Sequence, residues 1–132
     1  MNMQFNLKAI IFALLMIPFT TRVSAQQLSV NNPTEKKVLM LVSELPEVQA
    51  RSKAVKKLSH NKTDIVLSIS AQPDIYLPFY QVNVDDGPPG YANYYQFAVD
   101  PKSYQIFFYD AATNRQYSLT EWRKRKKKNN TP

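Results

Sequence analysis

Residues 94–109 decide the fold of this chain, and they read Tyr94-Tyr95-Gln96-Phe97-Ala98-Val99-Asp100-Pro101-Lys102-Ser103-Tyr104-Gln105-Ile106-Phe107-Phe108-Tyr109. Two runs of aromatic and β-branched residues flank Asp100 to Ser103, where the Asp-Pro pair suits the first two positions of a type I turn. The stretch therefore predicts a β-hairpin with a four-residue loop. Its cross-strand pairs are expected to be Val99 with Tyr104, Phe97 with Ile106, and Tyr95 with Phe108. Because side chains alternate along a strand, all six residues share the core face.

The opposite face of the hairpin carries three aromatic rings, those of Tyr94, Phe107 and Tyr109. Rings that combine apolar area with a polar tip suit the recognition of peptides or sugars. We therefore take the three residues as candidates for binding a partner. The alternative is that Leu119 and Trp122 cover them as a small second core, because large exposed apolar patches are uncommon on monomers.

Outward from the hairpin, the N-terminal half of the mature chain predicts a broken helix followed by strands. Asn32-Pro33 suits a helix start, an apolar stripe follows at helical spacing, and Pro46 breaks the helix before a second piece that ends near Leu58. The second piece has a thin stripe of Val48, Val55 and Leu58. Strands are expected over residues 63–70 and 75–84, before the two strands of the hairpin. Short connections then favour an α+β fold, with the broken helix packed on a four-stranded antiparallel meander.

Residues 1–25 have the layout of a secretory signal peptide. Met1 to Lys8 is positively charged, Ala9 to Phe19 is an apolar run too short to span a bilayer comfortably, and small residues precede Gln26. We expect cleavage near Ala25 and export to the periplasm or the extracellular space. An uncleaved N-terminal anchor is the alternative.

The expected mature domain, residues 26–122, must be stabilised by packing, because the chain contains no cysteine. Most of the formal net charge of +7 comes from residues near the end of the chain. Residues 26–122 contain nine basic and ten acidic residues, whereas six cations follow one another at Arg123, Lys124, Arg125, Lys126, Lys127 and Lys128.

The last residues, 123–132, contain no apolar side chain and are expected to be a disordered basic tail. Ser118 and Glu121 have the spacing of a capping box, so Leu119 and Trp122 are expected on a final helical turn before it. The tail favours weak contact with an anionic surface through charge alone. The near-neutral body argues against nucleic-acid binding.

Residues 85–91 must form a loop, because they hold both glycines of the chain and two prolines. Asp85, Asp86 and Tyr91 in this loop are further candidates for binding a partner. The two aspartates do not have the spacing of an EF-hand, so turn formation explains them better than calcium. With no cysteine nucleophile and a single histidine, His60, in a polar connection, the sequence predicts no catalysis, no metal and no cofactor.

The hairpin, with its Val99-Asp100-Pro101-Lys102 turn and Ile106 at the start of the next strand, resembles the small secreted PepSY-like proteins of Bacteroidetes. The resemblance implies a non-catalytic α+β module in the periplasm or outside the cell, of a class proposed to bind or restrain peptidases. The element order is also similar to that of cystatins, although Gln81 to Asp85 departs from the cystatin inhibitory motif.

These observations predict a monomeric binding module with an unknown protein or peptide partner, one that restrains a peptidase or serves an envelope complex. Three alternatives stay open. The first is an envelope-surface protein that docks on an anionic polymer through its basic tail. The second is a cystatin-like protease inhibitor, and the third is a hydrolase that would need His60 in a pocket with a serine and an acid.

Overall fold

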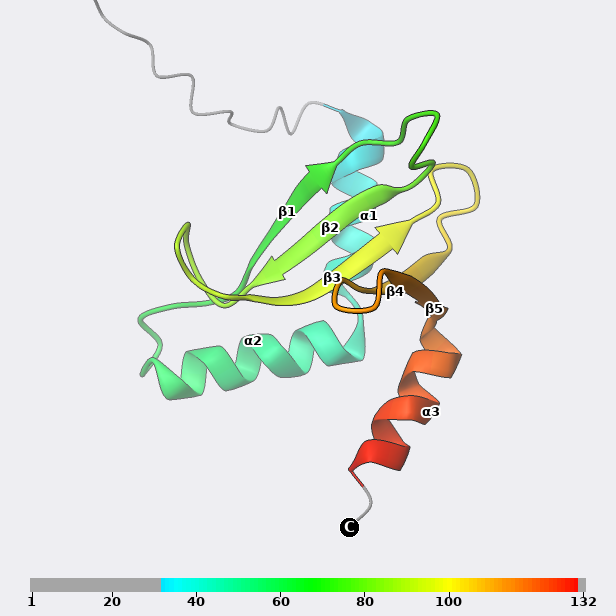
Figure 1. The fold of residues 1–132 in the computed structure, drawn as a ribbon. Helices are drawn as coiled ribbons and strands as arrows, with labels where there is room; N and C mark the ends of the chain where they lie inside the picture. The colour runs from blue at the N-terminus through cyan, green and yellow to red at the C-terminus, as the bar shows by residue number, and fades with distance from the viewer. Residues whose placement is uncertain (1–31, 131–132) are drawn as a thin grey trace, which may run out of the picture.

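The computed structural model describes residues 32–130 as a sheet with two helices on one side and a third helix that extends from its last strand (Figure 1). The elements in chain order are α1 (Pro33–Ser43), α2 (Pro46–Leu58), β1 (Val66–Ala71), β2 (Tyr80–Asp85), β3 (Asn93–Val99), β4 (Ile106–Asp110), β5 (Arg115–Ser118) and α3 (Leu119–Asn129). The strands form one antiparallel sheet in the order β1-β2-β3-β4-β5. The predicted α+β class is confirmed, but the predicted number of four strands is wrong. The predicted signal peptide lies outside the described residues.

The fifth strand, β5, is short and polar. It has only four residues, and it pairs with β4 from Phe107 opposite Ser118 to Asp110 opposite Arg115. A four-residue segment with Arg115 and Gln116 at its start has too little apolar alternation to predict a strand from sequence.

The two N-terminal helices begin and end where the sequence indicates. The side chain of Asn32 accepts a hydrogen bond from the Thr34 amide at 2.9 Å, and Pro33 takes the first position of α1. Pro46 likewise opens α2, so the predicted break is confirmed. Leu58 differs from its predicted burial, since it closes α2 with 75% of its surface exposed.

The central hairpin has a longer loop than predicted. Val99 lies opposite Ile106 rather than Tyr104, so the predicted register is wrong by two residues. Asp100 shapes the loop: its side chain accepts hydrogen bonds from the amides of Lys102 and Ser103 at 2.7 and 2.9 Å. Because the shift is an even number of residues, the predicted core face survives.

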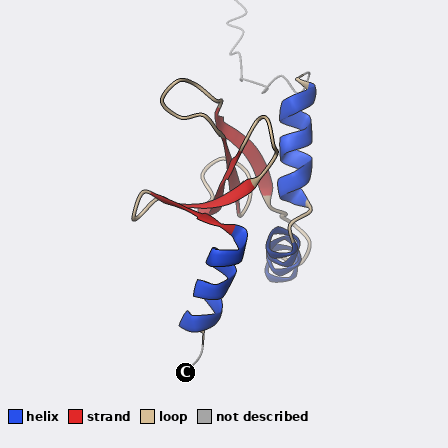
Figure 2. Ribbon diagram, turned by 90° about the vertical axis from the view of Figure 1, so that its right-hand side faces the viewer, coloured by secondary structure: helices blue, strands red, loops and turns tan. Residues whose placement is uncertain are grey.

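The core lies between the sheet and the helices. Figure 2 shows α1 and α2 on the same side of the sheet, while α3 leaves the end of β5 and projects beyond the sheet. The buried residues of this core come from all three helices and from β1, β2 and β3, and they are Val38, Val42, Val48, Ile69, Tyr80, Val82, Val84, Phe97, Val99 and Trp122. The last helix is therefore part of the core.

Residues 123–129 are helical, so the prediction of a disordered tail is wrong for them. The hydroxyl of Ser118 caps α3 by accepting from the Glu121 amide at 3.1 Å, as the capping-box spacing predicts. Glu121 also pairs with Arg125 one turn later at 2.9 Å. Lysines in the last turn stabilise α3, because they lie near the negative end of the helix dipole. The composition of the segment does not reveal this effect.

Within residues 32–130, no helix has the length and apolar character needed to cross a bilayer.

Candidate functional site

The position of α3 is set by its one buried side chain, Trp122. The indole lies flat on Phe108, with ring centroids 4.5 Å apart and planes within 6°, and it meets Phe97 and Tyr95 edge to face. Offset and edge-to-face ring pairs are favourable beyond the area they bury. This aromatic contact holds the cations of α3 beside the sheet.

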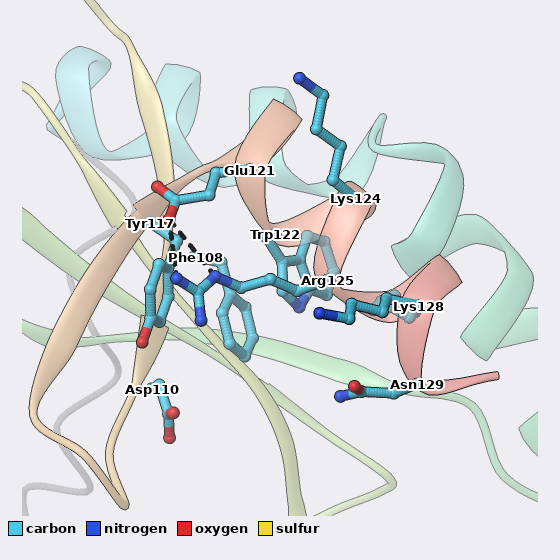
Figure 3. Close-up of a pocket in the computed structure, with 10 residues that line it drawn as sticks. Phe108, Asp110, Tyr117, Glu121, Trp122, Lys124, Arg125, Lys128 and Asn129 are labelled. Atoms are coloured by element: carbon cyan, nitrogen blue, oxygen red, sulfur yellow. Dashed lines mark hydrogen bonds and ion pairs between the residues drawn. The ribbon is translucent and has the colours of Figure 1, made fainter. Parts of the chain in front are cut away.

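A groove of about 680 Å³ lies between α3 and the last two strands (Figure 3). Arg125 crosses it: the guanidinium donates to Glu121 and lies 4.5 Å from the ring centroid of Tyr117. Lys128 and Asn129 point toward the groove from the last turn of α3, whereas Lys124 points away. The complete lining is Phe108, Asp110, Tyr117, Glu121, Trp122, Lys124, Arg125, Lys126, Lys128 and Asn129. The groove thus has aromatic walls and a cationic rim.

A second hollow, of about 360 Å³, is lined by residues of α2 and β3 and by Lys126 of α3. Glu47, which lines it, accepts a forked pair of hydrogen bonds from Arg123, at 2.6 and 3.1 Å. The hydrogen bond from Arg123 lowers the pKa of Glu47 below its ordinary value, and the same bond raises the pKa of Arg123. Lys126 lines this hollow as well as the groove, and its ammonium donates to the Tyr95 hydroxyl at 3.3 Å.

A third hollow, of about 250 Å³, follows between α2 and the loop of residues 86–91. Arg51 lines both this hollow and the second one. The guanidinium of Arg51 makes a forked pair with Asp86, at 2.8 and 2.6 Å. The Cζ atom of Arg51 lies 3.5 Å from the ring centroid of Tyr94. The hydrogen bond to Asp86 is the main reason that the pKa of Arg51 is raised.

The three hollows therefore adjoin at Lys126 and at Arg51, and we call the whole the α3–α2 trough. Its charge is uneven. The α3 end is lined by four cations and two acids, which are Lys124, Arg125, Lys126, Lys128, Asp110 and Glu121. The far end has the paired Arg51 and Asp86 beside apolar groups of Val55, Leu58 and Tyr91.

Tyr94 does not lie on the sheet face where the sequence placed it. Val84 pairs with Tyr95 and Asp85 pairs with Asn93, so Tyr94 is the extra residue of a β-bulge. Bulges turn a side chain away from the regular alternation. The ring of Tyr94 consequently rests against Arg51 on the helix side, and the prediction that it shares a face with Phe107 and Tyr109 is wrong.

Phe107 and Tyr109 remain on the face opposite the helices. Phe107 pairs with Ala98 and meets the ring of Phe79 edge to face at 5.7 Å, and the Tyr109 hydroxyl donates to Asn114 at 2.6 Å. The expected cover by Leu119 and Trp122 is wrong, because both pack into the core.

The structure brings only some of the candidate binding residues of the 85–91 loop into the trough. Asp86 and Tyr91 line the trough, whereas Asp85 accepts a hydrogen bond from the Asn93 side chain at 3.0 Å and is not part of the lining. His60 is exposed in the turn after α2. Across residues 32–130, no three histidine or acidic side chains gather in a way that would hold a metal ion.

Glu47 and Arg51 were not among the residues that the sequence indicated as candidates for binding a partner. A signal was present for Arg51, because it lies three residues after Val48 and four before Val55. Residues at this spacing share a helix face with the buried valines. Comparison of the chain with family models, with curated proteins and with solved structures gives no match.

Proposed function

We propose that the protein is an exported, non-catalytic binding module that holds an anionic polymer along the α3–α2 trough. The observation that carries this proposal is the separation of charge. Residues 26–122 sum to −1, whereas α3 alone carries six cations against one acid, on a helix held rigidly beside a groove. A surface of this kind concentrates anions and speeds their association.

Several cations of α3 have no acidic partner to satisfy them. Within residues 32–130, ion pairs are made by Arg123 and Arg125, but none is made by Lys124, Lys126 or Lys128. Crowded like charges repel one another along a helix, so an anion bound beside them relieves repulsion as well as adding attraction. This supports a charged ligand over a neutral one.

The shape of the trough supports a polymer over a small ion. The cations of the trough that make no ion pair with the described residues do not converge on one point, since Lys128 lines the groove and Lys126 lines both the groove and the second hollow. Each exposed cation attracts an anion weakly in water, whereas a chain that engages several of them at once gains from linkage between the contacts. A linear polyanion is the ligand that this spacing suits best.

The test is titration with poly-glutamate, followed by the fluorescence of Trp122, which is the single tryptophan and lines the groove. Lys126→Gln together with Lys128→Gln should weaken binding about tenfold and lower the salt slope by about 2, because two contacts to anions are lost. The matched control is Lys53→Gln with Lys57→Gln, which removes the same charge from exposed positions on α2.

The control pair should retain nearly the original affinity and salt slope. Equal losses in both variants would show attraction by net charge alone and would overturn the assignment to the trough. Absence of binding by the unaltered protein at low salt would overturn the function itself. Uncharged dextran should not bind. Binding of dextran would show non-specific adsorption of polymers and not recognition of charge.

A further inference from the structure

The two edges of the sheet differ in how well they are protected. At one edge, β5 is four residues long, begins with Arg115 and contacts α3. At the other edge, β1 has six residues, and its sequence, Val66 to Ala71, contains neither a charged residue nor a proline. Short strands, charges, prolines, bulges and covering helices are the usual means by which edge strands avoid pairing with other chains. β1 is not short and has neither a charge nor a proline, and its one irregularity is the register shift with β2 between Ile69 and Ala71.

The outer edge of β1 is also uncovered by the described part of the chain. α1 packs against the face of β1, behind the sheet, and no element among residues 32–130 lies alongside its outer edge (Figures 1 and 2). In an antiparallel sheet, alternate residues of an edge strand direct their N–H and C=O groups away from the neighbouring strand. Such a row of groups is complementary to one kind of ligand, another extended backbone.

We infer that β1 pairs antiparallel with β1 of a second copy of this chain, about a two-fold axis through Ser68. This register places Ser68 of one copy opposite Ser68 of the other and Leu67 opposite Ile69. Leu67 and Ile69 both face the core side, so residues of like face meet across the junction, as antiparallel pairing requires.

The argument for a second copy is the self-complementarity of the strand. On the face opposite the helices, the pairing brings Val66 opposite Ser70, so small side chains meet and no like charges are opposed. A two-fold pairing uses the same patch on both copies and closes after two, which gives a dimer rather than a fibre. It also extends the sheet continuously, with the helices of both copies on one side.

The association should be weak and dependent on concentration. The register of β1 with β2 shifts between Ile69 and Ala71, so the regular part of the edge is short. An interface of so few residues lies at the low end of the range for specific contacts. A reversible monomer–dimer equilibrium is therefore expected, and sedimentation velocity over a wide range of protein concentration measures it.

A single engineered thiol tests the register directly, because the chain has no cysteine. Directly opposed residues have Cβ atoms about 4.5–5.5 Å apart, close enough for a disulfide to form with a small adjustment. Ser68→Cys should therefore give a covalent dimer under mild oxidation. Ala111→Cys, at an exposed turn near the other edge, is the matched control and should stay largely monomeric.

A charge exchange at the same position completes the test. Ser68→Lys and Ser68→Glu should each abolish association, since like charges then meet at the axis, and an equimolar mixture of the two should restore it. Circular dichroism of each variant shows that it is folded. A protein that stays monomeric at the highest concentration overturns the inference, as does a dimer that Ser68→Lys leaves unchanged.

Discussion

Trp122 on α3 and Phe108 on β4 form a parallel stack, with 4.5 Å between ring centroids. The stack joins α3 to β4, the strand next to the edge of the sheet, and the indole is only 6% exposed. Without it, α3 would keep the ion pair from Arg123 to Glu47 but would lose its buried anchor.

Replacing that anchor should be costly. Trp122→Ala should lower the free energy of unfolding by about 3–5 kcal/mol, because a large ring is deleted from a packed layer and a cavity remains. Urea denaturation measures the change. Tyr76→Ala is the control, since the Tyr76 ring is 89% exposed, and it should change stability by no more than about 0.5 kcal/mol. Similar losses in both variants would contradict the role of the stack.

The pair between Glu47 and Arg123 should make stability depend on pH in the acidic range. Because the pKa of Glu47 is lowered in the folded protein, its contribution is present above the ordinary glutamate pKa, which is about 4.3. That contribution is lost as the pH falls through the lowered value. Glu47→Gln should therefore cost about 1 kcal/mol at neutral pH and nothing at strongly acidic pH.

The measurement is a series of denaturation curves at decreasing pH for both proteins. Glu44→Gln removes an exposed carboxylate that makes no ion pair within residues 32–130, and its effect should stay small throughout. A cost for Glu47→Gln that is the same at every pH would refute the electrostatic account.

Gln81 is a weak point of the fold. Only 5% of it is exposed, and both polar atoms of its amide are buried with no hydrogen-bond partner among the described residues. Its neighbours across the sheet are Ala71 and Ala98, which offer no polar side chain. Gln81→Leu should raise the free energy of unfolding by about 1 kcal/mol, since an unpaired buried amide is costly.

Thermal denaturation of Gln81→Leu checks this expectation. The control is Gln96→Leu, because Gln96 lies on β3 and faces the same side of the sheet as Gln81. Gln96 is less buried, so its replacement should give a smaller gain or none. Destabilisation by Gln81→Leu alone would mean that the amide has an essential partner.

Arg51 should order the loop of residues 86–91. Arg51→Lys keeps the charge but loses the forked hydrogen bonds to Asp86 and the flat contact with Tyr94, so it should cost about 1 kcal/mol. Amide hydrogen exchange in the loop should become faster. Arg115→Lys makes the same change at an exposed position and should leave the loop unchanged. Equal amide exchange rates in the loops of both variants would show that Arg51 does not order the loop.

Local rules were sufficient for the helix boundaries and for the core face of the hairpin. Asn32-Pro33 and Pro46 fix helix starts through backbone chemistry that any context preserves. The core face of the hairpin was predicted correctly even though its register was wrong, because a shift of two residues returns every side chain to the same side.

Features that depend on one extra residue or on distant partners could not be predicted in this way. The bulge at Tyr94 is a single insertion in β3, and nothing in an aromatic run shows where it falls. The helical state of residues 123–129 depends on Trp122 meeting Phe108 and on Arg123 meeting Glu47 of α2. Composition alone favours disorder for such a segment, and tertiary contacts reverse the preference.

The place of Trp122 in the chain also bears on how the protein is made. All five strands precede it, so a growing chain that has just completed β5 leaves the rings of Tyr95, Phe97 and Phe108 without their final cover. Such intermediates are prone to aggregate. A polypeptide stopped at Ser118 should bind the dye ANS strongly, and the intact protein should not. The helix that follows the last strand of the sheet is thus the one that covers these rings and ends the aggregation-prone stage.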